Sequence, residues 1–371
     1  MNMKIVFIPV AIFMIAFTVG IHFLVFTTLV KYLGIDSERI RLLMIILFYL
    51  LGVGFFVMSA LGHYNNNIFI KTGYIITAVW YGLLSNLAWM SVVIWALNKL
   101  NERFAFTADF KTFAIALMAV AVLITIYSVW AARTPKVKEI TVKLDNLPTH
   151  WIGKTAVKLS DIHLGVVYGA KWMNGVIEKV NTLGPDLVFI TGDYYDGSAP
   201  NYLELAEPLK NLKAKNGIFY VPGNHEFYSG NDYAMVKEAI QDTEIQFMQN
   251  EFTKIDGLTI IGADYIGHGK PHNLSDVVSE IEPDEPSILL QHEPRILPEV
   301  LEEKVDLQLS GHTHYGQIWP WNLFTYLVYS KYHYVLQQKG DLTLYTSNGT
   351  GAWGPPMRLW KRSEIVKIIL E

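Results

Sequence analysis

Residues of the kinds that bind metal ions or move protons lie in five short motifs between positions 161 and 314. The motifs are Asp161-Ile-His163, Gly192-Asp193, Gly223-Asn-His-Glu226, a single His292 and Gly311-His-Thr-His314. Carboxylate and amide oxygens beside imidazole nitrogens form a mixed shell that suits Mn²⁺, Zn²⁺ or Fe. The chain has no cysteine, which excludes thiolate metal sites and disulfides. The first two motifs alone are weak and the Gly-Asn-His-Glu and Gly-His-Thr-His motifs are moderately specific, but all five in this order predict a site for two divalent metal ions.

A short apolar run precedes most of these motifs, where a buried strand ends and a loop begins. The runs expected to be strands are Ala156–Ser160, Leu187–Thr191, Ile218–Val221, Ser287–Gln291 and Leu307–Ser310. The first part of this region alternates between strand and helix patterns, and the later part is rich in strands. The pattern predicts two packed sheets with helices outside them.

Longer stretches around the motifs resemble the calcineurin-like metallophosphoesterase family, from about Val157 to the C-terminus. The stretches that carry the resemblance are Ser160–Gly165, Thr191–Gly197, Leu309–Ile318, Ser347–Gly351 and Pro355–Arg358. They are most similar to a membrane-associated bacterial branch with phosphodiesterases similar to UDP-2,3-diacylglucosamine hydrolases and transmembrane proteins with a metallophosphoesterase domain. The resemblance implies an α/β (α+β) domain of four layers, with two mixed β-sheets flanked by helices. Tyr315 departs from it, because this branch usually has a second glycine there.

The resemblance also implies a role for each residue of the motifs. One metal ion would be held by Asp161, His163, Asp193 and His314, and the other by Asp193, Asn224, His292 and His312. Asp193 would bridge the two ions, since a carboxylate has two oxygens. A water that bridges two cations loses its proton near neutral pH and becomes the nucleophile. His225 is then the catalytic residue, free to stabilise developing charge or to protonate the leaving oxygen.

Residues beside the ligands have supporting roles in this interpretation. Asp196 and Glu226 are expected to orient ligating imidazoles. Gly223, Gly311 and Gly349 are expected to allow tight turns rather than to contact substrate. A single histidine such as His292 is more often structural, but its place in the series of motifs favours a ligand.

Four apolar stretches without Asp, Glu, Lys or Arg fill the first 130 residues, and each is about long enough to cross a bilayer. They are Ile5–Val30, Leu42–Leu61, Tyr74–Leu97 and Phe113–Trp130. The sequence therefore predicts a four-span transmembrane domain at 1–133 and a catalytic domain at 134–371. Basic residues are balanced across the two sides, so the side of the catalytic domain is left open. Polar His22 and Asn86 inside the spans are expected to make hydrogen bonds between helices.

The charge distribution separates the two regions. Of the 371 residues, 51% are hydrophobic and 17% charged. Residues 1–133 have 9 Lys and Arg against 4 Asp and Glu, a net charge of +5, and the rest has 21 against 30, a net charge of −9. An acidic catalytic region argues against nucleic acid as a partner.

A strongly aromatic segment follows the last ligand motif, between residues 317 and 338. Its aromatic residues are Trp319, Trp321, Phe324, Tyr326, Tyr329, Tyr332 and Tyr334. One interpretation is an ordinary core segment. The other is an interfacial lip that dips into lipid headgroups and receives an acylated substrate.

These observations predict a multi-pass protein of the cell (plasma) membrane that hydrolyses a phosphodiester or pyrophosphate by a metal-bridging hydroxide. The expected partners are the lipid bilayer and a phosphorylated, lipid-linked substrate similar to UDP-diacylglucosamine or a phospholipid headgroup. Alternatives are a phosphomonoesterase acting on a soluble substrate and a non-catalytic membrane scaffold. A scaffold would be indicated by a missing ligand or a missing His225, and none is missing. Metal identity, ester class and oligomeric state stay open.

Overall fold

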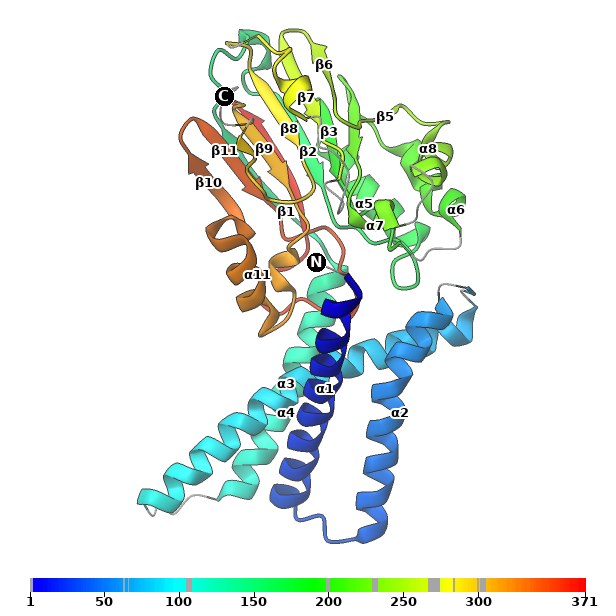
Figure 1. The fold of residues 1–371 in the computed structure, drawn as a ribbon, viewed down its shortest axis with the longest axis vertical. Coiled ribbons are helices and arrows are strands. Elements are labelled where there is room, and N and C mark those ends of the chain that lie inside the picture. Colours follow the sequence, from blue (N-terminus) through cyan, green and yellow to red (C-terminus); the bar gives the residue numbers. More distant parts are fainter. Residues whose placement is uncertain are drawn as a thin grey trace.

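The computed structural model describes residues 3–62, 64–65, 67–104, 109–197, 201–228, 233–265, 274–282, 284–298, 300 and 305–371. These residues form a helical part and a part built on two β-sheets (Figure 1). The helical part holds the N-terminal third of the chain, and the sheet part holds the five ligand motifs.

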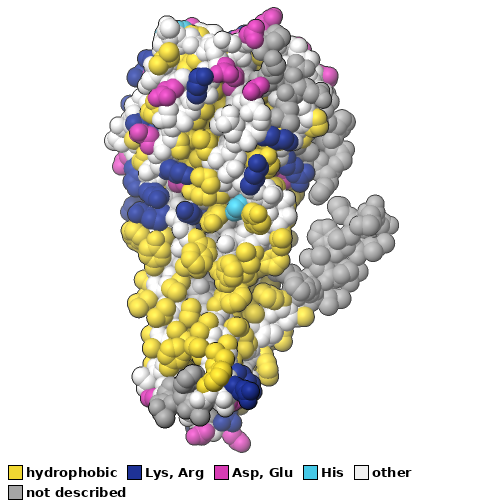
Figure 2. Space-filling model, turned by 90° about the vertical axis from the view of Figure 1, so that its left-hand side faces the viewer, with side chains coloured by type: hydrophobic (Ala, Val, Ile, Leu, Met, Phe, Trp, Pro, Cys, Tyr) yellow, Lys and Arg dark blue, Asp and Glu magenta, His cyan; other side chains and the backbone are white. Residues whose placement is uncertain are grey.

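Four long helices form the N-terminal part: α1 Met3–Leu33, α2 Glu38–Gly62, α3 Ile68–Phe104 and α4 Phe110–Arg133. All four are long and apolar enough to cross a membrane, which confirms the four predicted spans. Each helix extends beyond the apolar run that predicted it. At 1.5 Å per residue α3 is about 55 Å long, well above the thickness of a hydrocarbon core. Hydrophobic side chains cover most of the outer surface of this part in the view of Figure 2.

Polar side chains inside the helical part pair with one another across helices. The indole Nε1 of Trp80 in α3 donates to His22 Nε2 in α1 at 3.2 Å. The amide of Asn86 in α3 donates to Thr125 Oγ1 in α4 at 3.0 Å. The expected helix–helix hydrogen bonds of His22 and Asn86 are confirmed, and they satisfy groups that an apolar surrounding would otherwise leave unpaired.

The sheet part contains two six-stranded mixed sheets. The first has the order β1-β12-β2-β3-β4-β5, with bounds Lys136–Val142, Glu364–Leu370, Thr155–Leu159, Leu187–Thr191, Ile218–Val221 and Ile245–Phe247. The second has the order β10-β11-β9-β8-β7-β6, with bounds Val335–Lys339, Leu342–Thr346, Leu307–Ser310, Ser287–Leu290, Leu258–Gly262 and Glu251–Ile255. Strands β2 to β5 run parallel, as do β7, β8, β9 and β11. The predicted strands in front of the motifs are confirmed to within one residue.

Helices cover the outer faces of the sheets and complete the four layers: α5 Ala170–Thr182, α6 Tyr202–Ala206 and α8 Ala234–Ile240 on the first sheet, and α9 Leu274–Val278 on the second. Two further helices, α7 Asn224–Tyr228 and α11 Trp321–Tyr329, lie beside the ligand motifs. A core between the two sheets includes Phe189, Val221, Leu290 and Leu309. Separate cores lie between the first sheet and α5, α6 and α8, and between the second sheet and α9. The expected four-layer α/β architecture is confirmed.

One face of α3 runs along the side of the sheet part that holds the ligand motifs. The contacting residues recur every three or four positions, as one helix face requires: Tyr74, Ala78, Gly82, Ser85 and Trp89. Tyr74 and Ala78 share a small apolar core with Val166. Gly82 faces Met357, while Ser85 Oγ donates to Trp319 O at 2.8 Å and the Trp89 ring packs on the Trp319 ring. The helical part therefore supports the sheet part directly beneath its functional loops.

Candidate metal centre

The ligand motifs meet because the strands before them all end at one edge of the molecule. Strands β2, β3 and β4 of the first sheet are parallel, and so are β8 and β9 of the second sheet. Carboxyl ends of parallel strands share an edge, where loops collect the functional side chains. The packing of the two sheets brings both sets of loops together.

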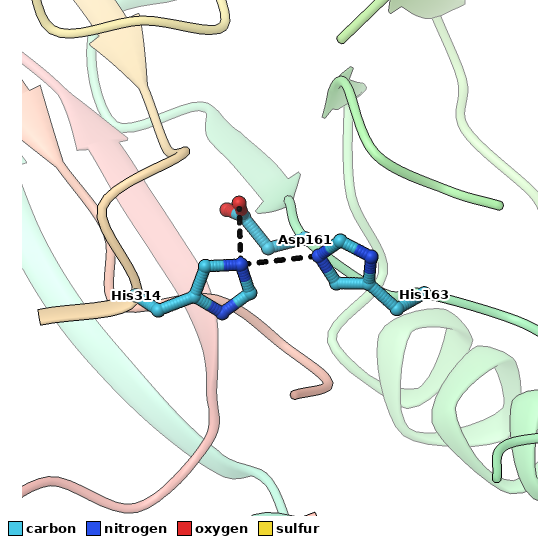
Figure 3. A group of neighbouring side chains, drawn as sticks. All are labelled: Asp161, His163 and His314. Carbon is cyan, nitrogen blue, oxygen red and sulfur yellow. Dashed lines mark hydrogen bonds and ion pairs between the residues drawn. The ribbon is translucent and has the colours of Figure 1, made fainter. Parts of the chain in front are cut away.

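Asp161, His163 and His314 form one group of side chains, drawn in Figure 3. His314 lies between the other two, with its Nε2 3.1 Å from His163 Nε2 and 3.4 Å from Asp161 Oδ1. Asp161 is fully buried, and its carboxylate also accepts from the Ser160 hydroxyl at 2.6 Å and from the backbone N–H of His312 at 2.8 Å. Three potential ligand atoms thus converge from two loops that are 150 residues apart in the chain.

Asn224, His292 and His312 form a second group on the other side of Asp193. Asn224 Oδ1 lies 2.9 Å from His312 Nδ1 and 3.2 Å from His292 Nε2. The other nitrogen of His292, Nδ1, lies 2.8 Å from the carbonyl oxygen of Thr191. This contact turns His292 Nε2 toward the group.

Asp193 lies between the two groups. Its Oδ2 is 3.1 Å from His292 Nε2 and 3.8 Å from His163 Nε2, so one carboxylate faces an imidazole of each group. Its Oδ1 accepts from the backbone N–H of His225 at 2.9 Å. The central position of Asp193 is what a bridging ligand needs.

His225 lies at the open side of the cluster on the short helix α7. Its ring is 4.6 Å from the His163 ring, centroid to centroid, and 5.9 Å from the ring of exposed Trp353. Burial opposes protonation of His225, but the carboxylates of Asp193 and Asp196 outweigh it and raise the pKa of the imidazole. The side chain is thus beside the cluster and not at its centre.

The backbone of the ligand loops is strained. Asp161, His163, Asp193, His312 and His314 have φ between 51° and 67°, a left-handed conformation that residues with a Cβ rarely adopt. Each such residue costs on the order of 1 kcal/mol. Strain of this kind persists where the surroundings dictate the conformation, and it is concentrated at functional sites. Here the five residues with this conformation are five of the seven candidate ligands.

Glycines beside the ligands act mainly through their missing side chains. Gly349 has φ 94°, so it serves as the expected tight turn. Gly223 and Gly311 are not among the described residues with positive φ, so a left-handed backbone is not the reason for a glycine at either position. A Cβ at Gly223 would overlap the Asp193 carboxylate, and one at Gly311 would overlap the Ser160 hydroxyl and the Asp161 carboxylate. They are glycines because the ligands pass too close for any side chain.

Burial keeps most of the imidazoles neutral. It lowers the pKa of His312 to about 3 and that of His314 to about 4, and it holds the pKa of His163 well below its ordinary value. His292 differs: burial opposes its charge, but the Asp193 carboxylate outweighs burial and raises its pKa to about 10. A neutral imidazole offers the lone pair that a metal ligand needs, and a metal displaces the proton from a charged one.

The donor set fits divalent metal ions. Two neutral imidazoles cannot both accept, so the 3.1 Å approach of His163 Nε2 and His314 Nε2 requires a proton or a cation between them. The same cluster brings buried carboxylate and amide oxygens among the imidazoles, the mixed shell that suits Mn²⁺, Zn²⁺ or Fe. Three sets of side chains have ligand atoms within 4.8 Å of one another: Asp161, His163 and His314; Asp193, His292 and His312; and His163, Asp193 and His225.

Supporting residues around the cluster differ partly from those expected. Asp196 Oδ1 lies 3.7 Å from His163 Nδ1, beyond hydrogen-bond distance, so its expected role of orienting that imidazole stays a prediction. Glu226 instead accepts from the backbone N–H groups of Asp193 and Gly223, both at 2.8 Å, so it fixes the ligand loops and not an imidazole. The structure brings together all seven expected ligands and His225.

Two charged residues near the cluster had no role assigned from the sequence. The buried guanidinium of Arg358 contacts His314 Nδ1 at 3.2 Å and donates to the carbonyl oxygens of His314 and Gly351. Glu293 Oε1 lies 3.6 Å from His312 Nε2. Glu293 follows His292 directly, which is a usable signal, whereas Arg358 reaches the cluster only through the tertiary fold.

Tyr315 takes a conformation that explains the glycine usual at its position. Its φ of 52° and ψ of 28° lie in the left-handed region. The Tyr315 ring stacks on His333 with centroids 5.1 Å apart and also packs on Tyr334. These contacts offset the cost of the backbone, which is on the order of 1 kcal/mol.

Comparison with known proteins gives the same family for the region that holds these motifs. A family model described as calcineurin-like phosphoesterase matches residues 157–316. The chain is 34% identical over 267 residues to an uncharacterized metallophosphoesterase of Campylobacter jejuni, and the match covers 70% of each chain.

Two vertebrate relatives are named as transmembrane proteins. Both are described as a transmembrane protein with metallophosphoesterase domain. The one from Danio rerio is 31% identical over 74% of this chain and 66% of its own length. The one from Bos taurus is 34% identical over 70% of this chain and 62% of its own length. The matches therefore span slightly less than two thirds of these two relatives.

Proposed function

The chain belongs to the calcineurin-like metallophosphoesterase family, and from that premise we propose a membrane-anchored, two-metal phosphoesterase that cleaves a phosphodiester or pyrophosphate of a lipid-linked molecule. In this proposal residues 1–133 are the transmembrane domain and residues 134–371 the catalytic domain. The membrane is the plasma membrane, and the substrate resembles UDP-diacylglucosamine or a phospholipid headgroup.

The observation that carries the proposal is the convergence of two ligand groups on the single carboxylate of Asp193. Asp193 Oδ2 faces His292 at 3.1 Å and His163 at 3.8 Å. A hydrolytic site that uses two ions needs a ligand with two oxygens between them, and an imidazole cannot serve both. The buried, strained loops hold this arrangement before any substrate binds.

Seven residues would hold the two ions. Asp161, His163, Asp193 and His314 would bind one, and Asp193, Asn224, His292 and His312 the other. Two ions bound there would supply an activated water and neutralise the charge that develops on the phosphoryl oxygens.

The protein's own contribution comes from His225 and the loops. His225 is not among these seven residues, although its ring nitrogen lies within 4.8 Å of ligand atoms of His163 and Asp193, and its ring is 4.6 Å from the His163 ring. From there its imidazole can donate a hydrogen bond to a phosphoryl oxygen or a proton to the leaving oxygen. The backbone N–H of His225 donates to Asp193 Oδ1, so the same residue also holds the bridging carboxylate in place.

A lipid-linked substrate is supported by the closeness of the ligand loops to the apolar helices. Val166, three residues after His163, packs against Tyr74 and Ala78 of α3. Trp319, five residues after His314, is hydrogen-bonded to Ser85 of the same helix. A soluble substrate would not need this position, whereas a phosphate at the end of a membrane lipid would be within reach.

The test uses the full-length protein in detergent with added Mn²⁺, Zn²⁺ or Fe²⁺. We expect metal-dependent hydrolysis of bis-p-nitrophenyl phosphate that is lost with a chelator and restored by the metal. In a panel of lipid pyrophosphates, lipid phosphodiesters and phosphomonoesters, the first two classes should be the better substrates. Faster hydrolysis of the soluble monoester p-nitrophenyl phosphate would contradict the ester class, and no turnover with any metal would indicate a binding role instead.

His225→Ala separates catalysis from metal binding. We expect kcat to fall on the order of 10²-fold with the bound metal unchanged, because the imidazole acts on the phosphate. His150→Ala is the matched control and should retain activity, because this exposed histidine lies before the start of β2 whereas the ligand Asp161 follows its end. Loss of metal in His225→Ala would instead make His225 a ligand.

A further inference from the structure

Helix α11 begins and ends beside the metal-ligand loop. The chain reaches α11 seven residues after His314, and at its other end the ring of Tyr329 lies 5.8 Å from the ring of His312. Just beyond the helix, the carbonyl oxygen of His333 accepts from Thr313 Oγ1 at 2.6 Å. The helix therefore forms part of the rim of the candidate metal centre.

The surface of α11 is apolar and exposed. None of its residues is buried and none is charged. Leu327 is 77% exposed and Val328 69%, while Leu323, Phe324 and Tyr326 are between 46% and 52% exposed. A continuous apolar surface of this kind is unusual in water and marks a binding surface. Of the two interpretations of the aromatic segment, a buried core does not hold for α11.

The start of α11 is fixed to a helix long enough to cross the membrane. Trp319, two residues before α11, packs its ring 5.3 Å from the ring of Trp89, and its carbonyl oxygen accepts from Ser85. Both partners lie near the middle of α3. Figure 1 shows α11 on the side of the sheet part that faces the long helices.

Basic residues surround the other end of α11. Lys331 lies in the short turn after the helix, with its Nζ 5.3 Å from the centre of the Tyr332 ring. Lys361 Nζ lies 5.5 Å from the centre of the Tyr334 ring. Arg362 lies over the ring of Trp130, near the end of α4, at 4.3 Å. Aromatic rings beside Lys and Arg are typical of the layer where acyl chains meet headgroups.

The space-filling view shows the same arrangement of apolar and basic side chains on the face that it presents. Hydrophobic side chains cover the region of the long helices, and Lys and Arg side chains gather in a band directly above them (Figure 2). Positive charge at this level attracts anionic headgroups, and the attraction acts only close to the membrane surface.

We propose that α11 is an interfacial helix that inserts Leu323, Phe324, Leu327 and Val328 among the acyl chains of a bilayer rich in anionic phospholipid. Lys331, Lys361 and Arg362 bind the phosphates of the headgroups at the same level. The rim of the metal centre then lies in the headgroup layer, so that a phosphoester of a membrane lipid enters the centre without leaving the bilayer. This last step rests on the proposed function, whereas the insertion of α11 does not.

The absence of cysteine from the chain allows a direct test of insertion. Single cysteines replace Leu327 or Val328 in the full-length protein, carry a nitroxide spin label, and are studied in nanodiscs of phosphatidylglycerol and phosphatidylcholine. The reference for acyl chains is Leu123→Cys on α4, and the reference for water is Leu203→Cys on α6, which are 64% and 57% exposed. The measured quantity is the ratio of collision with oxygen to collision with a water-soluble nickel complex.

We expect the ratio at Leu327 and Val328 to match that at Leu123 and to exceed that at Leu203 by about five-fold or more, because oxygen concentrates in acyl chains and the nickel complex does not. A ratio equal to that at Leu203 would overturn the insertion of α11, whatever the activity of the protein.

Activity then tests the delivery of lipid. In the double variant Leu327→Ser, Val328→Ser we expect the ratio of lipid-diester to bis-p-nitrophenyl phosphate turnover to fall by about five-fold or more, since the lost apolar area weakens contact with the bilayer. Leu203→Ser is the matched control. An unchanged ratio would overturn the delivery step. If the wild type hydrolyses only the soluble ester, the lipid part of the proposed function fails, and the spin-label ratio still decides whether α11 inserts.

Discussion

The two halves of the candidate metal centre are supported by different parts of the molecule. Asp161, His163 and His314 lie on loops that pack against the long helices. Asn224 and His292 lie on loops held by the two sheets, and His312 lies on the same loop as His314. Asp193 joins the halves.

The first half has direct connections to three of the long helices. The backbone N–H of Arg358, whose guanidinium contacts His314, donates to the carbonyl oxygen of Ser128 in α4 at 2.9 Å. The loop after His163 also reaches the helices: Val166 packs against α3, and a Cβ at Gly62 of α2 would lie 3.3 Å from the Val166 side chain.

The second half depends on the strands. His292 Nδ1 faces the carbonyl oxygen of Thr191 at the end of β3, and the carbonyl oxygen of His292 accepts from the N–H of Gly311 after β9. Such contacts exist within the sheet part and need no membrane. The helices are therefore more than a membrane anchor, because they contact the loops that hold one half of the centre.

Removing the charge of Asp193, which lies between the two halves, should have the largest effect on turnover. Asp193→Asn keeps the shape of the side chain but takes away the charge of the central carboxylate, so both halves should bind metal weakly. We expect turnover of bis-p-nitrophenyl phosphate to fall on the order of 10³-fold or more. The matched control is Asp145→Asn, whose side chain is 69% exposed. Turnover near that of the wild type would show that the halves work independently.

Arg358→Ala should affect the first half alone. The buried guanidinium contacts His314 and Gly351, and loss of such a supporting group lowers metal affinity about 10- to 100-fold. We expect the metal content, measured by mass spectrometry, to fall toward one ion per chain. Arg295→Ala, which removes a 53% exposed arginine that pairs with Glu293 near the second half, should change little. Loss of both ions from Arg358→Ala would contradict separate support.

A substitution in the membrane helices should reach the first half through Met357. A Cβ at Gly82 in α3 would overlap Met357 Sδ, so Gly82→Val must displace the residue next to Arg358. We expect turnover to fall about ten-fold, and Met357→Ala in the same chain to restore part of it by removing the overlap. Gly20→Val in α1 is the control, because no atom lies within 4 Å of a Cβ there. Equal effects at Gly20 and Gly82 would indicate general damage to the helices.

The smallest effect on turnover is expected from a substitution of Lys158, which lies on β2 between the two sheets. Burial lowers its pKa from 10.5 to about 8, and its Nζ donates to Ser347 Oγ at 2.9 Å. Between pH 8 and 10.5 the unfolded chain therefore binds more protons than the folded one. The free energy of unfolding should rise with pH across this window, by up to about 3 kcal/mol.

Lys158→Met should remove this rise, because methionine has no proton to lose. The measurement is the difference in unfolding free energy between wild type and variant at pH 7.5 and pH 10.5, with metal removed. A difference that does not change with pH would mean that Lys158 titrates normally in the folded protein.

The strands and the ligand order were predictable from local sequence. A short apolar run shortly before Asp161 or Asp193 indicates both a buried strand and the polar loop that follows it. Because the strands before the motifs are parallel within each sheet, their ends share an edge, and the motifs meet there. The four long helices were predictable for a similar reason, since about 20 apolar residues without a charge have few other stable environments.

Other features left no local trace. Gly223 and Gly311 were expected to be turns, but the reason for each is the closeness of Asp193 or Asp161. Glu226 was expected to orient an imidazole, but its partners are backbone N–H groups. A sequence shows that a glycine or a glutamate is present, and only the neighbours in space show what it permits or binds.

The sequence by itself determined which residue types can bind metal and which segments are apolar enough for a membrane, because these depend on residue type and local periodicity. Only the tertiary structure shows that one half of the centre packs against α3 and α4, that the Arg358 guanidinium contacts His314, and that α11 is exposed beside the long helices. Ser85 and Trp319 are 234 residues apart, and no periodic pattern links them. Contacts at such separations are set by how complete elements pack, so they follow only from the folded chain.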